Sequence, residues 1–466
     1  MQSASSSRRK FLQVSGLASA ASLLSGCPAN QSAEAPSPGR AKNLIFLMVD
    51  GLCNGTLGLA HHWKLRNKGE RLHWMQLYDR PDFHRCFQDT ASASSPVTDS
   101  AAAASSWGSG QRVMNGSVNV DASGKQLKPI LSYAKEAGKK TGLVTTCRIT
   151  HATPAGFATN VHDRYMEDEI ARQYMEREID VLLGGGSRHF VQTQKDGSPV
   201  DYLSIFQSRG YDIALNRSEL SLHTSNRRLL GLFSKSHLPY AIDRKNDPAL
   251  SGVPSLTEMF EAALARLSGA ENGFVLQVEG GRVDHAGHAN DPGAILHEFL
   301  EYDACIPIAL EYIRKHPDTM LIVTTDHGTG GCQLDGQGDR YNDSGPALDR
   351  INQLNFSFEW LQKRFEARGQ FDAATLEAAL HIEATTEQAA LVQKALDEEA
   401  KYLSGALDAA FGRQLKQMTS VGWSSSKHTS ECVDLFAFGP HAMNVPAFMN
   451  NYEIFGIMME ALGLKV

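Results

Sequence analysis

A chain of 466 residues, of which 42% are hydrophobic and 21% charged, can bury a full-sized core and has the composition of a folded globular protein. Its length allows two or three average domains, or one large α/β layer structure with insertions. The net charge of −7 is small for this length and no long run of Lys or Arg follows the N-terminus, which argues against nucleic acid as a specific partner.

The N-terminus predicts an export signal, residues 1–27, that is not part of the folded domain. Residues 7–12 (SRRKFL), followed by an apolar stretch, resemble a twin-arginine signal. Residues 24–27 (LSGC) resemble a lipobox, in which Cys27 becomes the lipidated first residue of the mature protein. An ordinary cleaved secretory signal with a chance cysteine is the alternative.

Residues 28–41 are rich in Pro, Ala, Ser and Gln, which predicts a flexible tether. No later segment is long and apolar enough to suggest a membrane span. We therefore expect the remaining domain, residues 42–466, to lie in the periplasm or at the cell surface, held to a membrane through Cys27.

Six further cysteines are widely spaced and fit no zinc-knuckle pattern: Cys53, Cys86, Cys147, Cys305, Cys332 and Cys432. An even number in an oxidising compartment permits disulfides. Twin-arginine export carries folded proteins, however, and a protein that folds in a reducing cytoplasm need not depend on disulfides. Buried free thiols and one or two disulfides both stay open.

Short continuous apolar runs predict strands that are buried on both faces of a parallel sheet. They cover residues 44–49, 142–147, 181–183, 274–278, 320–325 and 433–438. Helical patterns alternate with them at 130–139, 256–267 and 292–315, the last opening with Asp291 as cap and Pro292 in the first turn. This alternation predicts an α/β fold in which helices cover a central parallel sheet.

The segment 98–107 (TDSAAAASSW) places cap residues in front of four alanines, which predicts a helix that begins near Ser100. The unpaired N–H groups and positive dipole end of a helix N-terminus suit an anion. A capped helix without further function is the other reading of this segment.

Acids and histidines follow several of the predicted strands. Asp50 follows the first, Glu279 and Asp326 follow the runs at 274–278 and 320–325, and the run to 147 leads into residues 148–154 (RITHATP). Ligands of open α/β sheets bind beyond the carboxyl ends of the strands, so these side chains should gather along one edge. A single acidic residue after a strand indicates only a turn. Several acids and histidines at neighbouring strand ends favour a metal site.

The spacing of the histidines supports bound metal. Asp284 and His288 are four residues apart, so on one helical turn they face the same way and can hold one ion. Asp326 and His327 are neighbours that would point to opposite faces of a continuing strand. The glycines at 328, 330 and 331 let the chain bend there, which allows both side chains to reach one ion.

These residues together closely resemble the alkaline phosphatase family, in the family's order, over roughly residues 42–445. The resemblance is carried by Asp50-Gly51 and by residues 98–102 (TDSAA), 151–154 (HATP), 279–285 (EGGRVDH) with His288, 325–327 (TDH), 427–429 (KHT) and 438–442 (FGPHA). It implies a three-layer α/β/α sandwich with a large, mainly parallel central sheet. It also implies hydrolysis of small phosphate monoesters through a phosphoserine on Ser100.

The resemblance implies a site with two zinc ions and one magnesium ion. The first zinc would take Asp284, His288 and His428, and the second would take Asp50, Asp326 and His327. Magnesium, which prefers oxygen ligands, would take the second oxygen of Asp50 together with Thr153 and Glu279.

The resemblance also implies roles for side chains around the phosphate. Arg164, eleven residues after Thr153, would bind two phosphate oxygens with its planar fork, and Asp99 would orient it. His151 is expected beside the magnesium position, where zinc or cobalt could replace magnesium. We expect His285 to interact with bound phosphate when it is protonated.

The segment 332–422, with helical periodicity at 356–367, 373–382 and 386–399, is an insertion. It is expected either to form a lid or crown that shapes access to the site or to make a contact in a homodimer. A solvated helical excursion without direct function is equally compatible. Alternatives to the function are a phosphodiesterase or sulfatase of the same superfamily, and a non-catalytic zinc-binding lipoprotein.

Overall fold

The computed structural model describes residues 39–193, 199–222, 227–336, 343–369, 372–398, 400–411 and 419–465. The predicted export signal, residues 1–27, and most of the predicted tether, residues 28–41, lie outside the described residues. Among the described residues, no helix combines the length and the apolar character that crossing a membrane requires.

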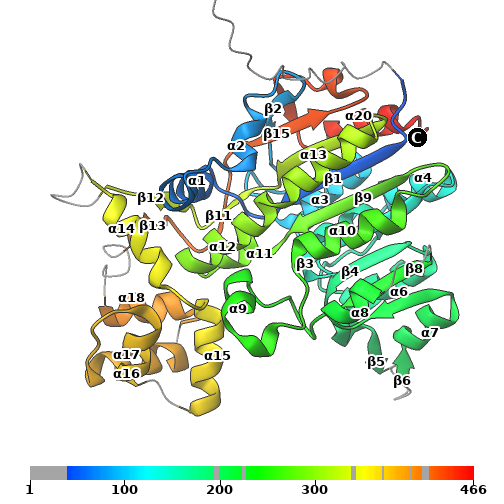
Figure 1. The fold of residues 1–466 in the computed structure, drawn as a ribbon. Coiled ribbons are helices and arrows are strands. Elements are labelled where there is room, and N and C mark those ends of the chain that lie inside the picture. The colour runs from blue at the N-terminus through cyan, green and yellow to red at the C-terminus, as the bar shows by residue number, and fades with distance from the viewer. Residues whose placement is uncertain are drawn as a thin grey trace, which may run out of the picture. The chain divides into compact units, whose positions relative to one another are not determined.

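A ten-stranded sheet forms the centre of the fold (Figure 1). From one edge to the other its strands are β16 (Phe448–Asn450), β2 (His84–Asp89), β15 (Val433–Phe438), β10 (Thr319–Thr325), β1 (Asn43–Val49), β9 (Phe274–Gly280), β3 (Lys140–Arg148), β4 (Val181–Gly185), β8 (Arg228–Leu232) and β7 (Tyr211–Ala214). From β10 to β7 all neighbours are parallel, as expected. The six predicted strands therefore all exist.

Alternate residues of β1 enter two separate hydrophobic cores. Ile45, Leu47 and Val49 face one core, and Leu44 and Phe46 face the other. Helices packed on the first face are α1 (Asn54–Lys68), α2 (His73–Leu77), α8 (Arg217–Leu222), α9 (Ala241–Asn246), α10 (Leu256–Leu267), α12 (Pro292–Asp303) and α13 (Cys305–Lys315). Those on the second face are α3 (Ser100–Ser109), α4 (Ile130–Glu136), α5 (Ala152–Ala158), α6 (Glu167–Glu176), α7 (Tyr202–Ser208) and α20 (Glu453–Leu462). The fold is thus the three-layer α/β/α sandwich that the resemblance implies.

The predicted helix 292–315 is two helices, α12 and α13, which meet at Ala304. Pro307 explains the break, because its ring lacks the N–H that would bond to the carbonyl of Asp303 and clashes with that carbonyl in a continuous helix. The predicted cap is present, since the Asp291 carboxylate accepts from the N–H groups of Gly293 and Ala294.

The strand predicted at 433–438 runs antiparallel to β10 instead of parallel. After β10 the chain forms the short strand β11 (Gly328–Thr329), which later pairs antiparallel with β14 (His428–Thr429). This pairing returns the chain to the edge of the sheet that it left, so β15 has to run back in the opposite direction. It also places His428 next to the end of β10.

The insertion at 332–422 begins with β12 (Gln333–Leu334) and ends with β13 (Val421–Gly422), which pair antiparallel at its base. Between them lie α14 (Gly345–Asp349), α15 (Phe358–Arg368), α16 (Ala373–Leu380), α17 (Thr386–Glu398) and α18 (Leu403–Phe411), which are grouped together in Figure 1. Buried residues of α15 and α18, such as Leu361 and Leu407, join the first hydrophobic core. The insertion is therefore packed onto the sandwich.

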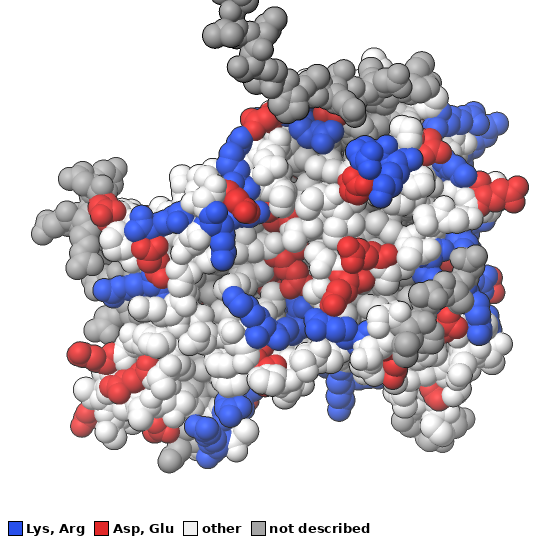
Figure 2. Space-filling view, in the orientation of Figure 1, with Lys and Arg blue, Asp and Glu red and all other residues white. Residues whose placement is uncertain are grey.

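All six cysteines beyond Cys27 are free thiols, and Cys432 is the one that is only partly buried. Lys, Arg, Asp and Glu are interspersed on the face drawn in Figure 2, which agrees with the small net charge.

Candidate active site

The chemistry-bearing residues gather where four parallel strands end. Asp50 follows β1 and Glu279 lies near the end of β9, in register with Met48 of β1. Asp326 and His327 follow β10, and the segment after β3 carries His151. Because β3, β9, β1 and β10 are adjacent and parallel, these side chains meet at one edge of the sheet, as the sequence predicts.

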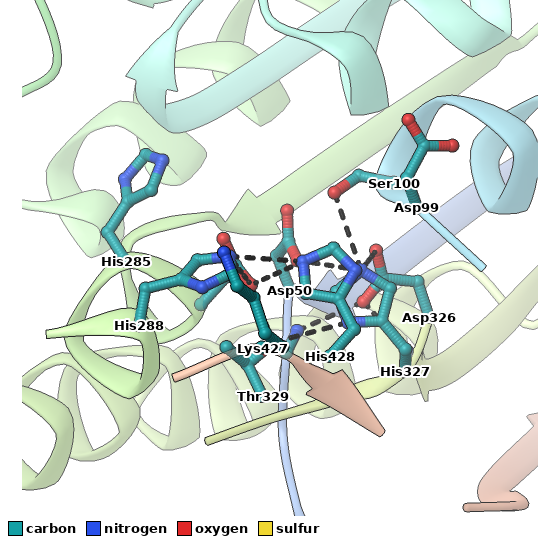
Figure 3. A network of polar contacts seen from close by, with 12 residues as sticks. Asp50, Asp99, Ser100, His285, His288, Asp326, His327, Thr329, Lys427 and His428 are labelled. Carbon is teal, nitrogen blue, oxygen red and sulfur yellow. Dashed lines mark hydrogen bonds and ion pairs between the residues drawn. The ribbon is translucent and has the colours of Figure 1, made fainter. Parts of the chain in front are cut away.

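The imidazoles of His288 and His428 converge at the first predicted zinc position (Figure 3). The Nε2 atoms of His288 and His428 are 3.1 Å apart, and each lies 3.4 Å from Oδ1 of Asp284. Ligand atoms about 2.1 Å from a tetrahedral zinc ion lie roughly 3.4 Å apart. The spacing of this group therefore fits one zinc ion.

The hydrogen bonds of the Nδ1 atoms determine which tautomer the rings of His288 and His428 adopt. Nδ1 of His288 lies 2.7 Å from the carbonyl of Ser426, and Nδ1 of His428 lies 2.9 Å from the carbonyl of Thr98. A carbonyl only accepts, so each Nδ1 carries a proton, and in the neutral rings both Nε2 atoms present lone pairs. Two lone pairs and a carboxylate oxygen would then face one another, an arrangement that needs a proton or a cation between them. Without ions it is a proton, because the hydrogen bond and charge of Asp284 outweigh burial and raise the pKa of His428 to about 9.

At the second predicted zinc position, an unprotonated histidine nitrogen again faces carboxylate oxygens. Nε2 of His327 lies 3.2 Å from Oδ2 of Asp326 and 3.6 Å from Oδ1 of Asp50. The Thr329 hydroxyl donates its one proton to Oδ1 of Asp284 at 2.6 Å, so toward Nδ1 of His327, 3.3 Å away, it can only accept. Nε2 of His327 is consequently another unprotonated lone pair directed at two carboxylates.

Buried oxygens without partners mark the predicted magnesium position. Both carboxylate oxygens of Asp50, Oγ1 of Thr153 and Oε1 of Glu279 are buried and have no hydrogen-bond partner among the described residues. Leaving such groups unpaired costs free energy, and oxygen donors are what magnesium prefers. Nδ1 of His151 is likewise buried without a partner, and His151 has a ring nitrogen within 4.8 Å of oxygens of Asp50 and Glu279. The donor set thus fits an ion at this position, with His151 beside it.

Burial and neighbouring negative charge make the carboxyl groups of Asp50, Glu279 and Asp326 weak acids in the absence of ions. Burial, followed by the charges of Asp326, Asp284 and Glu279, raises the pKa of Asp50 well above its usual value. Burial raises the pKa of Glu279 and that of Asp326 to about 7. Such a cluster favours the binding of cations, which would let all the carboxylates ionise together.

Ser100 is the first residue of α3, and its hydroxyl reaches the second zinc position. The Asp99 carboxylate caps the helix by accepting from the N–H of Ala102 at 2.9 Å. Oγ of Ser100 is buried and lies 3.4 Å from Nε2 of His327. Ser100 therefore combines a helix N-terminus with a place beside the predicted ligands.

Arg164 is held at the same site by two neighbours. Its Nη1 donates to Oδ2 of Asp99 at 2.9 Å, and its Nη2 lies 3.1 Å from Nε2 of His151. The same Asp99 oxygen accepts from the N–H of Gly116 at 2.9 Å, which fixes the carboxylate. The predicted orienting contact between Asp99 and Arg164 is thus present.

The interaction of His285 with phosphate, directly or through water, stays a prediction. In Figure 3 its ring points away from the group around Asp50, and its Nδ1 is 3.9 Å from Sγ of Cys147. Burial, followed by the charge of Arg282, lowers the pKa of His285 to about 3.

Other residues at the site were not singled out from the sequence. Thr329 contacts Asp284 and His327, and the Thr145 hydroxyl donates to Oε2 of Glu279 at 2.5 Å. The signal for Thr329 is its place two residues after His327, in a glycine-rich turn. The carbonyls of Thr98 and Ser426 left no signal, because a backbone acceptor can belong to any residue type.

A family model described as alkaline phosphatase matches residues 41–464. The chain belongs to the alkaline phosphatase family. Alkaline phosphatase 3 of Bacillus subtilis is 31% identical, over 98% of this chain and 98% of its own length. The crystal structure of Thermus thermophilus alkaline phosphatase has 35% sequence identity and a TM-score of 0.85, and covers 95% of this chain and 96% of that chain.

A second solved structure, a cold-active alkaline phosphatase from Shewanella sp., is 28% identical with a TM-score of 0.75, over 90% of this chain and 99% of that chain. These comparisons confirm the predicted family and fold. The chain is a phosphatase, its substrates are phosphate esters, and its family depends on metal ions. This conclusion contradicts the alternative of a non-catalytic lipoprotein.

Removal of the ions should make the protein less stable as the pH rises. Without ions the folded protein holds the pKa of Asp326 and Glu279 at about 7, above their ordinary values of 3.8 and 4.5. Their stabilising contribution is then fully present below about pH 4 and is lost as the pH rises through about 7. Removal of the ions should therefore lower the melting temperature by an amount that increases from about pH 5 to about pH 8.

The same melting curves recorded with zinc and magnesium present serve as the control. Asp243, Asp291 and Glu298, whose pKa values burial also raises, contribute equally to both series and cancel in the difference. The stabilisation by ions should grow with pH. A difference that stays constant over this range would contradict the electrostatic account.

Thr329→Val should weaken zinc binding, because it removes the acceptor for Nδ1 of His327 and the donor to Asp284. Loss of such supporting hydrogen bonds typically costs about 10- to 100-fold in metal affinity. Zinc affinity is measured by competition with a chromophoric chelator. Thr429→Val is the matched control on the paired strand β14, since its hydroxyl donates to Glu431; equal affinities for the two variants would refute the role of Thr329.

Proposed function

We propose that this chain hydrolyses phosphate monoesters through a phosphoserine on Ser100, in a site that holds two zinc ions and one magnesium ion. The single observation that carries the proposal is the position of Oγ of Ser100 at the start of α3, 3.4 Å from a lone pair of His327. An acceptor at this distance favours a hydroxyl that points its proton toward the ligand cluster.

The residues fit the three ions by their donor chemistry. Asp284, His288 and His428 suit the first zinc, and Asp50, Asp326 and His327 suit the second. The partnerless oxygens of Asp50, Thr153 and Glu279 suit magnesium, with zinc or cobalt as replacements because His151 adds a nitrogen. When bound, such ions lower the pKa of a hydroxyl and neutralise charge on phosphoryl oxygens.

The residues around Ser100 are arranged to receive a phosphate. The N–H groups that precede Ala102 at the start of α3 have no partner within the helix, so they can donate to an anion at its N-terminus, whereas Asp99 caps that of Ala102. Arg164, anchored by Asp99, can offer the remaining edge of its guanidinium to phosphoryl oxygens. These fixed positive groups supply the local attraction that a weakly acidic chain lacks at long range.

The proposed reaction has two displacement steps. In the first, Oγ of Ser100 gives up its proton to solvent and forms a bond to phosphorus while the bond to the alcohol oxygen breaks, and the departing alkoxide takes up a proton from solvent. In the second, a water oxygen bonds to phosphorus, the Oγ bond breaks, and Ser100 regains a proton as phosphate leaves. The hydroxyl of Ser100 is thus regenerated at the end of the reaction.

The place of action is a further part of the proposal. The twin-arginine pattern at residues 7–12 and the lipobox at 24–27 support export of the folded chain and attachment to a membrane through a lipid on Cys27. The enzyme would then act on phosphate esters in the periplasm or at the cell surface. The proposed role of the insertion is that of a lid or crown over the site, or of a contact between the copies of a homodimer.

Ser100→Ala should lower the rate of p-nitrophenyl phosphate hydrolysis by about 10³-fold or more, because no other hydroxyl occupies this position. Incubation of the wild type with phosphate at mildly acidic pH, followed by quenching and mass spectrometry, should find a phosphoryl group on Ser100. Ser106→Ala is the matched control, since the Ser106 hydroxyl is buried on the same helix and donates to the carbonyl of Ala102. A phosphoryl group on another residue would overturn the proposed nucleophile.

Arg164→Ala should weaken inhibition by inorganic phosphate by about 10- to 100-fold, the equivalent of the roughly 1.5–3 kcal/mol expected of a hydrogen bond to a charged group. The inhibition constant is measured at a fixed concentration of zinc and magnesium. Arg172→Ala should leave the constant unchanged, because Arg172 pairs with Glu169 on α6 away from the site. Equal constants for the Arg164 variant and the wild type would exclude a contact with phosphate.

A further inference from the structure

A second group of metal-binding residue types lies next to the site but outside the set proposed for the three ions. Cys147 lies near the end of β3, His237 lies between β8 and α9, and His285 lies on α11, which spans Arg282–His288. Ligand atoms of these three residues all lie within 4.8 Å of one another. The thiol of Cys147 is fully buried, and the two imidazoles are partly buried.

We propose that Cys147, His237 and His285 form a further metal site that takes Zn²⁺ or a similar thiophilic divalent ion, with a fourth position open to solvent. One thiolate and two imidazoles are a preferred donor set for zinc, and sites with three protein ligands leave a position for water or another small ligand. This set contains a sulfur ligand, whereas the three ions proposed above take only nitrogen and oxygen.

Close packing brings the three side chains together. The rings of His237 and His285 contact each other with centroids 4.3 Å apart, and Nδ1 of His285 lies 3.9 Å from Sγ of Cys147. Gly281 leaves room for the thiol, because a Cβ at this position would lie 2.7 Å from Sγ. These distances exceed those between ligands of a bound ion, so binding would draw the three groups inward.

Charge near the thiol favours a cation over an isolated thiolate. Burial, followed by the charges of Glu279 and Asp50, raises the pKa of the Cys147 thiol. The guanidinium groups of Arg282 and Arg148 act in the opposite direction. On binding, the thiol would release its proton to solvent and the ion would neutralise the thiolate.

Arg148 is the group with which an ion has to compete. Its guanidinium lies against Nε2 of His237, and its backbone N–H lies 3.3 Å from Nδ1. A neutral imidazole accepts through only one nitrogen, so one of these contacts sets an N–H of the ring against a donor. The guanidinium of Arg148 would keep its ion pair with Glu167, at 2.7 to 3.0 Å, if the ring of His237 rotated to bind an ion.

A cavity supplies the path to this site and the space for a fourth ligand. It has a volume of about 290 Å³, and both His237 and His285 line it. Its other walls include Phe358 and Glu359 of α15 and Tyr402 before α18, so the insertion covers this side. An ion held by the three residues could therefore exchange its fourth ligand from the cavity.

The test uses the full chain after removal of its metals and saturation with Co²⁺. Only a sulfur ligand gives a thiolate-to-cobalt charge-transfer absorption in the near ultraviolet, so the ions held by nitrogen and oxygen do not contribute to it. The wild type should show this band, and Cys147→Ser should lose it together with one equivalent of bound cobalt. Cys305→Ser should keep both, since Cys305 is a buried thiol whose Sγ contacts the carbonyl of Glu301.

His237→Gln is a second variant, at a less buried position, for the case in which Cys147→Ser does not fold. It should retain the thiolate band with a shifted spectrum and bind this cobalt ion at least about tenfold more weakly. Ser100→Ala should keep the band, so the new site and the proposed nucleophile can fail separately. Absence of the band from cobalt-saturated wild type, or its persistence in Cys147→Ser, would overturn the proposal.

Discussion

The active site depends on acceptors that are forced to face one another. His288, His327 and His428 each have Nδ1 fixed by a carbonyl or hydroxyl, which leaves three Nε2 lone pairs directed at Asp50, Asp284 and Asp326. A proton on His428 satisfies one of these contacts, because the hydrogen bond and charge of Asp284 outweigh burial and raise the pKa of His428 to about 9. Buried oxygens of Asp50 and Asp326 still have no hydrogen-bond partner among the described residues. Bound cations would satisfy these acceptors together.

Asp50, Glu279 and Asp326 stand at the ends of adjacent buried strands, which brings their charges together at one edge of the sheet. The position of these ligands also depends on a close approach between the segment after β1 and α11. Gly51 has a φ of +76°, and a Cβ there would lie 2.7 Å from the Cα of Asp284, so the segment after β1 can pass directly beside α11. Its N–H donates to Oδ1 of Asp326 at 3.0 Å, which orients that carboxylate.

The sequence predicted the parts of the fold that carry strong local patterns. Buried apolar strands such as β1 and β10, the capped start of α3 and the ligands at strand ends are all recognisable from residue type and spacing. β2, with polar and partly exposed residues, and the short strand β16 lack such a pattern, and they exist because neighbours pair with them.

The break at Ala304 was missed, although Pro307 could have indicated it. Contacts made by long-range packing left no local signal. The antiparallel course of β15 and the meeting of Cys147 with His237 depend on how distant segments return to one edge of the sheet.

The most direct measurement is the anomalous scattering of zinc in crystals of the protein grown with zinc and magnesium. The account predicts one strong peak among Asp284, His288 and His428 and a second among Asp50, Asp326 and His327, both within bonding distance of the nitrogen and oxygen atoms named. Crystals without zinc at these two positions, with the imidazoles still facing the carboxylates, would contradict it.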